Sequence, residues 1–267
     1  MAVLRIHFFS QCLQRNVDFN MFLPNDPREG QKEPVIKTGF FLHGYTGSAE
    51  DFWELTELAE KYHFAMVMPN AENSFYLDAE ATGFQYGTYV GKELVEYVRK
   101  TFHLAMKRED TFVAGLSMGG FGALHTGLAF PENFGRIIAL SSALIIHEIA
   151  GIQEGEKNEV ANYEYYFRCF DRLDMVEKST NNPETLLLQL IEQNKEIPEI
   201  YMACGTEDFL LENNRAFHCF LEEHKIEHLY YEGPGIHDMV FWREYFRKGM
   251  EWVVTANKQS KDRENES

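Results

Sequence analysis

Hydrophobic residues recur along the chain with two different periods. Apolar and polar residues alternate over 3–9 and again over 16–23, which predicts two antiparallel strands at the start of a sheet. Further along, short apolar runs typical of buried strands alternate with segments of helical period. The predicted strands are 35–42, 64–68, 111–114 and 136–140, and the predicted helices are 51–62, 90–102 and 118–130. We therefore predict an α/β fold of right-handed βαβ units, with a mostly parallel sheet covered by helices on both faces.

This alternation stops after residue 144 and resumes near residue 199. Residues 145–195 are polar and rich in aromatic side chains, and we expect them to form a mostly helical insert. The aromatic cluster at 163–170 is better explained by an amphipathic helix that packs on the core than by the lining of a pocket. After the insert, the predicted strands are 199–204 and 228–231, and the predicted helices are 213–224 and 241–254.

The composition is that of a globular protein with an excess of acidic residues. Hydrophobic residues make up 45% and charged residues 25% of the 267 residues, so a core of normal size can form. Twenty-five Lys and Arg against 42 Asp and Glu give a net charge of −17, which disfavours nucleic acid and membrane surfaces as partners. The sequence shows neither a secretory leader nor an apolar run of the roughly 20 residues that a membrane span requires. We expect a cytoplasmic protein whose four scattered cysteines are free thiols, and a homo-oligomer is compatible with the sequence.

A G-x-S-x-G motif, formed by Gly115, Ser117 and Gly119, lies between a predicted strand and a predicted helix. In such a strand–turn–helix setting the serine backbone is strained so that its Oγ projects from the turn. The glycines are needed because side chains two residues away would collide with neighbouring backbone. We therefore predict that Ser117 is a nucleophile; the alternative is a glycine-rich tight turn with a surface serine.

A serine hydroxyl needs a base to take its proton, and the base needs a carboxylate to orient it. In this kind of fold the chain order is Ser, then Asp or Glu, then His. Among ten histidines His237 fits best, because it follows the strand 228–231 in a glycine-containing loop and precedes the last helix. The strand before that one leads into Glu207 and Asp208, which are the two candidates for the acid.

The other titratable residues near these positions receive structural interpretations. Asp238 is expected to begin the last helix, where its charge complements the helix dipole. His218, His224 and His228 are expected on or beside a helix, and their spacing with Cys219 matches no metal-ligand pattern. We predict no metal and no cofactor.

Acyl transfer places negative charge on the carbonyl oxygen, so hydrogen-bond donors must already point there. One predicted donor is the backbone N–H of Met118, directly after the serine. The other is the N–H of Tyr45 in the loop after the third strand, where Gly44 lets the chain approach closely. His43 is expected to brace this loop by hydrogen bonds rather than to transfer protons.

Four ordered blocks of sequence resemble the esterase D group of α/β-hydrolases and, within it, the bacterial tributyrin esterases (EstA-like proteins). The blocks are FLHGYTGSAEDF, REDTFVAGLSMGGFGAL, CGTEDFLLENN and GPGIHDMVFWREYF. The resemblance implies the α/β-hydrolase fold and a serine carboxylesterase acting on short-chain acyl esters. It also implies a triad of Ser117, Asp208 and His237, and so favours Asp208 over Glu207.

The order of the motifs assigns nearly the whole chain to one hydrolase domain over 1–256, because the triad is drawn from the second to the last βα unit. Residues 145–195 are then a cap-like insert and 257–267 a polar tail. The expected partner is a small-molecule ester.

Several other functions are alternatives on the same scaffold. Relatives of this group include S-formylglutathione hydrolases, feruloyl esterases and sugar-ester deacetylases. The glutathione branch tends to carry cysteine and threonine where this chain has Tyr45, Thr46 and Gly47, which disfavours that activity. An acyltransferase and a catalytically silent hydrolase fold used for binding are the remaining alternatives.

Overall fold

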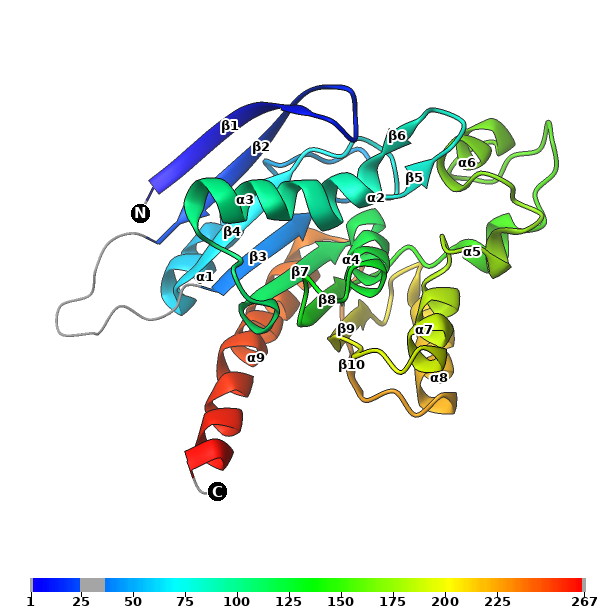
Figure 1. Ribbon diagram of the computed structural model, residues 1–267. Coiled ribbons are helices and arrows are strands. Elements are labelled where there is room, and N and C mark those ends of the chain that lie inside the picture. The colour runs from blue at the N-terminus through cyan, green and yellow to red at the C-terminus, as the bar shows by residue number, and fades with distance from the viewer. Residues whose placement is uncertain (1, 25–36, 266–267) are drawn as a thin grey trace.

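The computed structural model describes the backbone of residues 2–24 and 37–265, with side chains up to Thr255. Within these ranges the main sheet has eight strands in the order β1-β2-β4-β3-β7-β8-β9-β10 (Figure 1). The strands are β1 (Ala2–Ser10), β2 (Arg15–Leu23), β3 (Lys37–Leu42), β4 (Phe64–Pro69), β7 (Thr111–Leu116), β8 (Arg136–Leu140), β9 (Glu199–Gly205) and β10 (His228–Gly233). The first two positions of the predicted strand 35–42 lie outside the described residues.

The sheet is mostly parallel, as the sequence predicts. Strand β1 pairs antiparallel with β2, and β2 pairs antiparallel with β4. Every pair from β4 to β10 along the sheet is parallel. The predicted antiparallel pair at the N-terminus is therefore confirmed, and the carboxyl ends of β3, β7, β8, β9 and β10 face the same edge.

Helices cover both faces of this sheet (Figure 1). They are α1 (Thr56–Tyr62), α2 (Tyr86–Thr88), α3 (Leu94–Phe102), α4 (Met118–Ala129), α5 (Ile146–Ile149), α6 (Tyr163–Phe170), α7 (Pro183–Glu192), α8 (Leu211–Glu223) and α9 (Met239–Asn265). The turn between α2 and α3, Tyr89–Glu93, is a π-helix. Helix α9 continues well beyond the predicted 241–254. The predicted helix 51–62 begins too early, because α1 is preceded by a 3₁₀ turn, Trp53–Leu55.

Alternating strand residues fill two separate hydrophobic clusters. In β3, Phe40 belongs to the cluster on the side of α3, α4 and the insert, whereas Phe41 belongs to the cluster on the side of α1 and α9. Ile137 and Ile138 in β8 divide in the same way. Because both faces of each central strand are buried, these strands appear in the sequence as continuous apolar runs.

The segment 145–195 contains α5, α6, α7 and a 3₁₀ turn, Val176–Lys178, joined by irregular chain. A two-stranded hairpin, β5 (Asp78–Ala79) and β6 (Phe84–Gln85), lies beside α6 in Figure 1, and Asp171 Oδ1 accepts the N–H of Glu80 at 3.0 Å. The insert thus contacts the loop that follows β4. No helix in the described ranges is long and apolar enough to span a bilayer.

A buried histidine on α4 makes the stability of the fold dependent on pH. His125 is 7% exposed, its Nε2 lies 3.0 Å from the carbonyl oxygen of Thr180, and its Nδ1 has no partner among the described residues. Burial lowers the pKa of His125 from 6.5 to about 4.

The folded protein therefore excludes a proton that the unfolded chain accepts below about pH 6.5. We expect the free energy of unfolding to fall by about 3 kcal/mol as the pH falls from 6.5 to 4, in addition to the contributions of other groups. Urea unfolding at several pH values should show a shallower dependence for His125→Gln, which keeps a donor for Thr180. Equal slopes for the two proteins would contradict this assignment.

Candidate active site

Ser117 lies in the sharp turn between β7 and α4, as predicted. Its φ of 56° and ψ of −120° are unusual for a residue with a side chain, a conformation that costs on the order of 1–3 kcal/mol. The turn is held by backbone hydrogen bonds: the Ser117 N–H donates to Leu140 O at 2.9 Å, and its carbonyl accepts the N–H of Ala143 at 3.0 Å. These bonds fix the backbone from which the hydroxyl projects.

The two glycines of the motif are required by close contacts between backbones. A Cβ at Gly115 would lie 2.0 Å from the carbonyl oxygen of Gly119. A Cβ at Gly119 would lie 1.8 Å from the carbonyl oxygen of Leu42, at the end of β3. Any side chain at either position would push α4 away from the sheet and displace Ser117.

The structure brings Ser117, His237 and Asp208 into one hydrogen-bonded chain. His237 Nε2 lies 2.9 Å from Ser117 Oγ, and His237 Nδ1 lies 2.9 and 3.0 Å from the two carboxylate oxygens of Asp208. A carboxylate can only accept, so Nδ1 carries the proton and Nε2 is free to accept the serine hydroxyl. This is the protonation state that a general base needs.

The carboxylate of Asp208 is buried yet stays ionised. Burial alone raises its pKa, but hydrogen bonds from His237, the Leu210 N–H and Ser141 outweigh this effect and hold the pKa of Asp208 below its usual value. Glu207, the alternative acid, instead accepts the Gly235 N–H at 2.8 Å. Its role is to fix the loop that carries His237.

Trp242 and Ser141 also support the imidazole, and neither residue was predicted from the sequence. Trp242 in α9 packs edge-on against His237, with ring centroids 4.8 Å apart, and its Nε1 donates to Ser141 Oγ at 3.0 Å. Ser141 follows β8 directly and has a φ of 44°. The sequence could have pointed to Ser141, because it is a polar residue at the carboxyl end of a central strand. Trp242 lies inside the last of the four sequence blocks that carry the family resemblance.

The predicted oxyanion donors also lie beside the serine turn. A Cβ at Gly44 would lie 3.5 Å from Ser117 Cβ, so the loop after β3 contacts the turn directly. In the described part of the chain, the backbone N–H groups of Tyr45 and Met118 have no hydrogen-bond partner. Unpaired donors next to the serine turn are what an oxyanion that develops there would need.

His43 braces this loop through both ring nitrogens. Its Nδ1 lies 2.8 Å from Gly44 O, and its Nε2 accepts the Ala71 N–H at 3.0 Å. Burial lowers the pKa of His43, which keeps the ring neutral. With both nitrogens bonded to backbone, His43 has no free position for proton transfer.

Asn73 connects the loop after β3, called here the oxyanion loop because it carries the predicted donor Tyr45, to the insert. Nothing in the sequence pointed to this residue. Its Oδ1 accepts the Thr46 N–H at 2.7 Å, and Thr46 has a φ of 64°. Its backbone carbonyl accepts the Tyr165 hydroxyl at 2.7 Å and the Cys169 thiol at 3.4 Å. The Tyr165 ring also packs edge-on against Tyr45, at a centroid distance of 5.7 Å.

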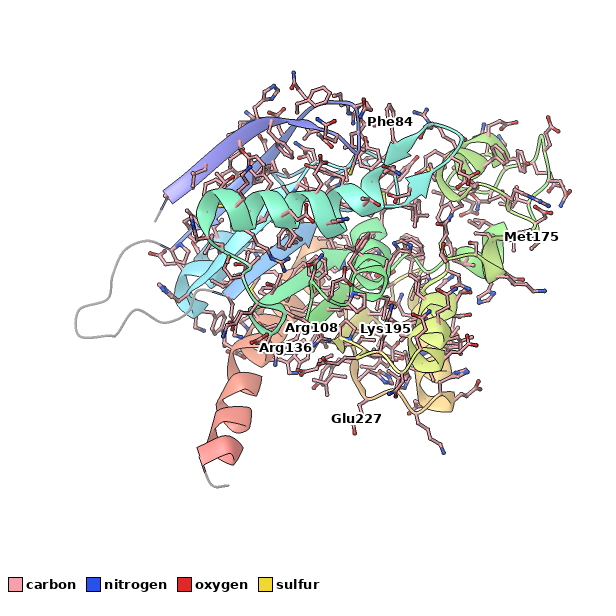
Figure 2. All side chains as sticks on the ribbon, in the orientation of Figure 1. Phe84, Arg108, Arg136, Met175, Lys195 and Glu227 are labelled. Atoms are coloured by element: carbon pink, nitrogen blue, oxygen red, sulfur yellow. The ribbon has the colours of Figure 1, made fainter. Side chains whose placement is uncertain are left out.

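A cavity of about 310 Å³ opens next to Tyr45. Its walls come from the loop after β4, the β5–β6 hairpin and α6, and Phe84 on β6 is labelled in Figure 2. The lining includes Tyr45, Asn73, Phe84, Tyr86, Tyr165 and Arg168. The aromatic cluster of the insert therefore serves two purposes: Tyr166 and Phe170 are buried in the core, while Tyr165 lines the cavity.

The remaining polar candidates have structural positions. Asp238 Oδ1 accepts the N–H groups of Val240 and Phe241 at the start of α9, as expected. His218 and His228 form a hydrogen-bonded pair, 2.7 Å between Nδ1 and Nε2. Among the described residues no group of histidine, cysteine and acidic side chains could hold a metal ion, and all four cysteines are free.

Comparison with known proteins gives a consistent result. A family model described as "Putative esterase" matches residues 10–253. An acetyl esterase of Caldicellulosiruptor saccharolyticus is 42% identical over 261 residues, covering 95% of this chain and 98% of that protein.

Solved structures of serine hydrolases superpose on this chain over nearly its whole length. The serine hydrolase FphF of Staphylococcus aureus superposes with a TM-score of 0.84 at 25% identity, covering 95% of this chain and 98% of that one. An S-formylglutathione hydrolase of the same organism (FrmB) superposes with a TM-score of 0.81 at 26% identity, covering 95% and 99%. The α/β-hydrolase fold expected from the sequence is confirmed.

We expect Asn73 to position the oxyanion loop. Asn73→Ala should lower kcat for p-nitrophenyl acetate about tenfold with little change in KM, because a displaced Tyr45 N–H binds the oxyanion less well; loss of a whole donor costs about 10²–10³. Asn73→Asp, which keeps the acceptor oxygen, should recover most of the rate.

Asn70→Ala is a matched control. Asn70 Oδ1 accepts the Ala49 N–H at 2.8 Å, farther along the same loop, so its loss removes a comparable hydrogen bond without touching Thr46. We expect kcat within twofold of the wild type for this variant. An equal loss of kcat in both alanine variants would contradict a specific effect of the hydrogen bond between Asn73 and Thr46 on catalysis.

Proposed function

Because this chain belongs to the "Putative esterase" family and is a carboxylic ester hydrolase of the serine hydrolase type, we propose that it hydrolyses short-chain acyl esters, acetyl esters foremost, through an acyl-Ser117 intermediate. The observation that carries the proposal is the hydrogen-bonded chain from Asp208 through His237 to Ser117, with 2.9 Å between Nε2 and Oγ. The unpaired N–H groups of Tyr45 and Met118 beside Ser117 support it.

In the proposed acylation, Ser117 Oγ attacks the ester carbonyl carbon while its proton moves to His237 Nε2. Negative charge develops on the carbonyl oxygen and is stabilised by the N–H groups of Tyr45 and Met118. The imidazolium is stabilised by the ionised carboxylate of Asp208. Collapse of the intermediate breaks the bond to the alcohol oxygen, which leaves with the proton from Nε2.

Deacylation repeats these steps with water. His237 takes a proton from a water molecule, whose oxygen attacks the acyl carbon, and the oxyanion again forms next to the same two donors. The C–O bond to Ser117 breaks, Oγ regains a proton from Nε2, and a carboxylic acid is released. No step needs a group from outside the chain other than ester and water.

The preference for short acyl groups rests on similarity. The acetyl esterase relative is 42% identical over almost the whole length of both chains, far more than the S-formylglutathione hydrolase FrmB at 26%. We also propose that 1–256 act as one catalytic domain, because the three proposed catalytic residues come from the turn after β7, the turn after β9 and the loop before α9. Residues 145–195 then form a cap over one side of the site.

Replacing the proposed nucleophile tests the mechanism. Ser117→Ala should reduce kcat for p-nitrophenyl acetate by about 10⁶, as in other serine triads, and abolish labelling by a fluorophosphonate probe. Ser142→Ala is a matched control, because the Ser142 hydroxyl is buried near the turn and has no partner among the described residues. Substantial hydrolysis or labelling that survives in Ser117→Ala would contradict the proposal.

The substrate class is tested with a series of esters. We expect kcat/KM to be highest for acetyl esters, to decline through butyryl esters and tributyrin, and to be at least tenfold lower for octanoyl esters. Acetylated sugars, feruloyl esters and S-formylglutathione belong in the same series, together with an alcohol acceptor that detects acyl transfer. A kcat/KM for S-formylglutathione a hundredfold above that for acetyl esters would instead assign the thioesterase function.

A further inference from the structure

Three large apolar side chains that lie close to Asp208 or His237 in the sequence are exposed to solvent. Phe209 is 70% exposed, Ile236 is 55% exposed and Val240 is 81% exposed. Phe209 follows Asp208 directly, Ile236 precedes His237, and Val240 is the second residue of α9. We call these three residues the apolar rim. Single exposed apolar residues are ordinary on a protein surface, but three on the segments that carry Asp208 and His237, one of them in contact with the imidazole, point to a binding surface.

Phe209 contacts the imidazole without being part of the core. Its ring centroid lies 4.6 Å from that of His237, at an angle of 47° between the planes. Trp242, the other aromatic contact of the imidazole, is only 8% exposed and is hydrogen-bonded through its Nε1. The imidazole is therefore already held by Trp242 and by Asp208, and the exposed phenyl ring is available to a ligand.

The backbone next to Phe209 is held by hydrogen bonds, so its side chain is exposed on an ordered turn. The Leu210 N–H donates to Asp208 Oδ1 at 2.9 Å, and the Asp208 N–H donates to Gly205 O at 3.1 Å. Leu210 itself is 5% exposed and belongs to the core. The turn thus buries Leu210 and directs Phe209 outward beside the imidazole.

The chemistry of the proposed reaction decides which part of a substrate lies here. The alcohol oxygen leaves with the proton from His237 Nε2, so it must come within about 3 Å of that nitrogen. The acyl group stays on Ser117, and its carbonyl oxygen faces the N–H groups of Tyr45 and Met118. An exposed side chain that contacts the imidazole, as Phe209 does, is therefore placed to meet the alcohol part of the ester.

The rim is bounded by charge, which limits the size of its occupant. Beyond Val240 the surface is lined mainly by charged side chains of the turn before α1, of α1 and of α9. These are Glu54, Glu57, Arg243, Glu244 and Arg247, with Leu58 among them. An alcohol with one aromatic ring or a short branched chain would contact the rim without reaching this charged surface.

We propose that Phe209, Ile236 and Val240 form a leaving-group subsite that selects esters of apolar, and above all aromatic, alcohols. The inference rests on the proposed function, since it assigns the alcohol side of that same reaction. Phe209 is the main determinant, because an aromatic alcohol can pack on its ring beside the imidazole. Favourable packing of two aromatic rings corresponds to about a tenfold effect on the rate of acylation.

The test is a series of acetate esters that differ only in the alcohol. Methyl, n-butyl and benzyl acetate all give the same acetyl-Ser117, so differences in kcat/KM among them report the alcohol part alone. We expect Phe209→Ala to lower kcat/KM about tenfold for benzyl acetate and less than twofold for methyl acetate. Phe209→Tyr should keep the preference for benzyl acetate.

Phe167→Ala is the matched control. Phe167 is a 39% exposed phenylalanine of α6, outside the rim, stacked on Tyr163. It should leave the ratio of benzyl to methyl acetate unchanged. Thermal unfolding of both variants checks that the loss of an exposed ring leaves the fold intact.

Two outcomes overturn the inference while leaving the proposed function in place. An equal loss for all three acetates would show that Phe209 supports the imidazole and selects nothing. A concentration-dependent dimer in sedimentation that is lost in Phe209→Ala, with no change in the benzyl-to-methyl ratio, would assign the rim to a second copy of the chain. Failure of the wild-type protein to hydrolyse any acetate would instead contradict the proposed function itself.

Discussion

The close approach of α4 to the ends of the central strands is the constraint on which the rest of the site depends. Gly119 brings the first turn of α4 so near to β3 that a Cβ there would lie 1.8 Å from Leu42 O. Gly120 does the same on the other side, where a Cβ would lie 2.7 Å from Leu140 O. Only with α4 held this close can Ser117 adopt its positive φ and project its hydroxyl between the loops after β3 and β10. The hydrogen bonds from the Ser117 backbone to β8 and its following loop offset the strain of that conformation.

Much of this arrangement could be predicted from the sequence, because it follows from local rules. Apolar runs identified the parallel strands, and the glycines of the serine motif identified the turn. The order of serine, acid and histidine then placed the remaining candidates at the carboxyl ends of later strands. Asp208 and Glu207, which the local rules could not separate, differ because the turn after β9 points one carboxylate at His237 and the other at the Gly235 N–H.

What could not be predicted are contacts between segments far apart in the chain. Asn73 contacts Thr46 and Tyr165, which are separated by more than a hundred residues, and nothing in its own neighbourhood distinguishes it from other loop asparagines. The extent of α9 was missed for a different reason. The residues of its last turns, 257–265, are all polar in the sequence. The helical spacing of apolar residues, from which the helix was predicted, therefore stops before the helix itself ends.

The two sides of Ser117 differ in physical character. On the side of the proposed oxyanion donors, His43 contacts Gly44 O and Asn73 accepts the Thr46 N–H, so the loop after β3 is positioned by polar contacts with fixed directions. Helix α6 is bound to the same support, since the carbonyl of Asn73 accepts from Tyr165 and Cys169. A change in the insert can therefore alter the geometry of the oxyanion loop as well as the shape of the adjoining cavity. On the imidazole side the exposed contact of His237 with Phe209 is apolar and carries no directional bond, so the proposed leaving-group subsite can vary without moving the proposed oxyanion donors.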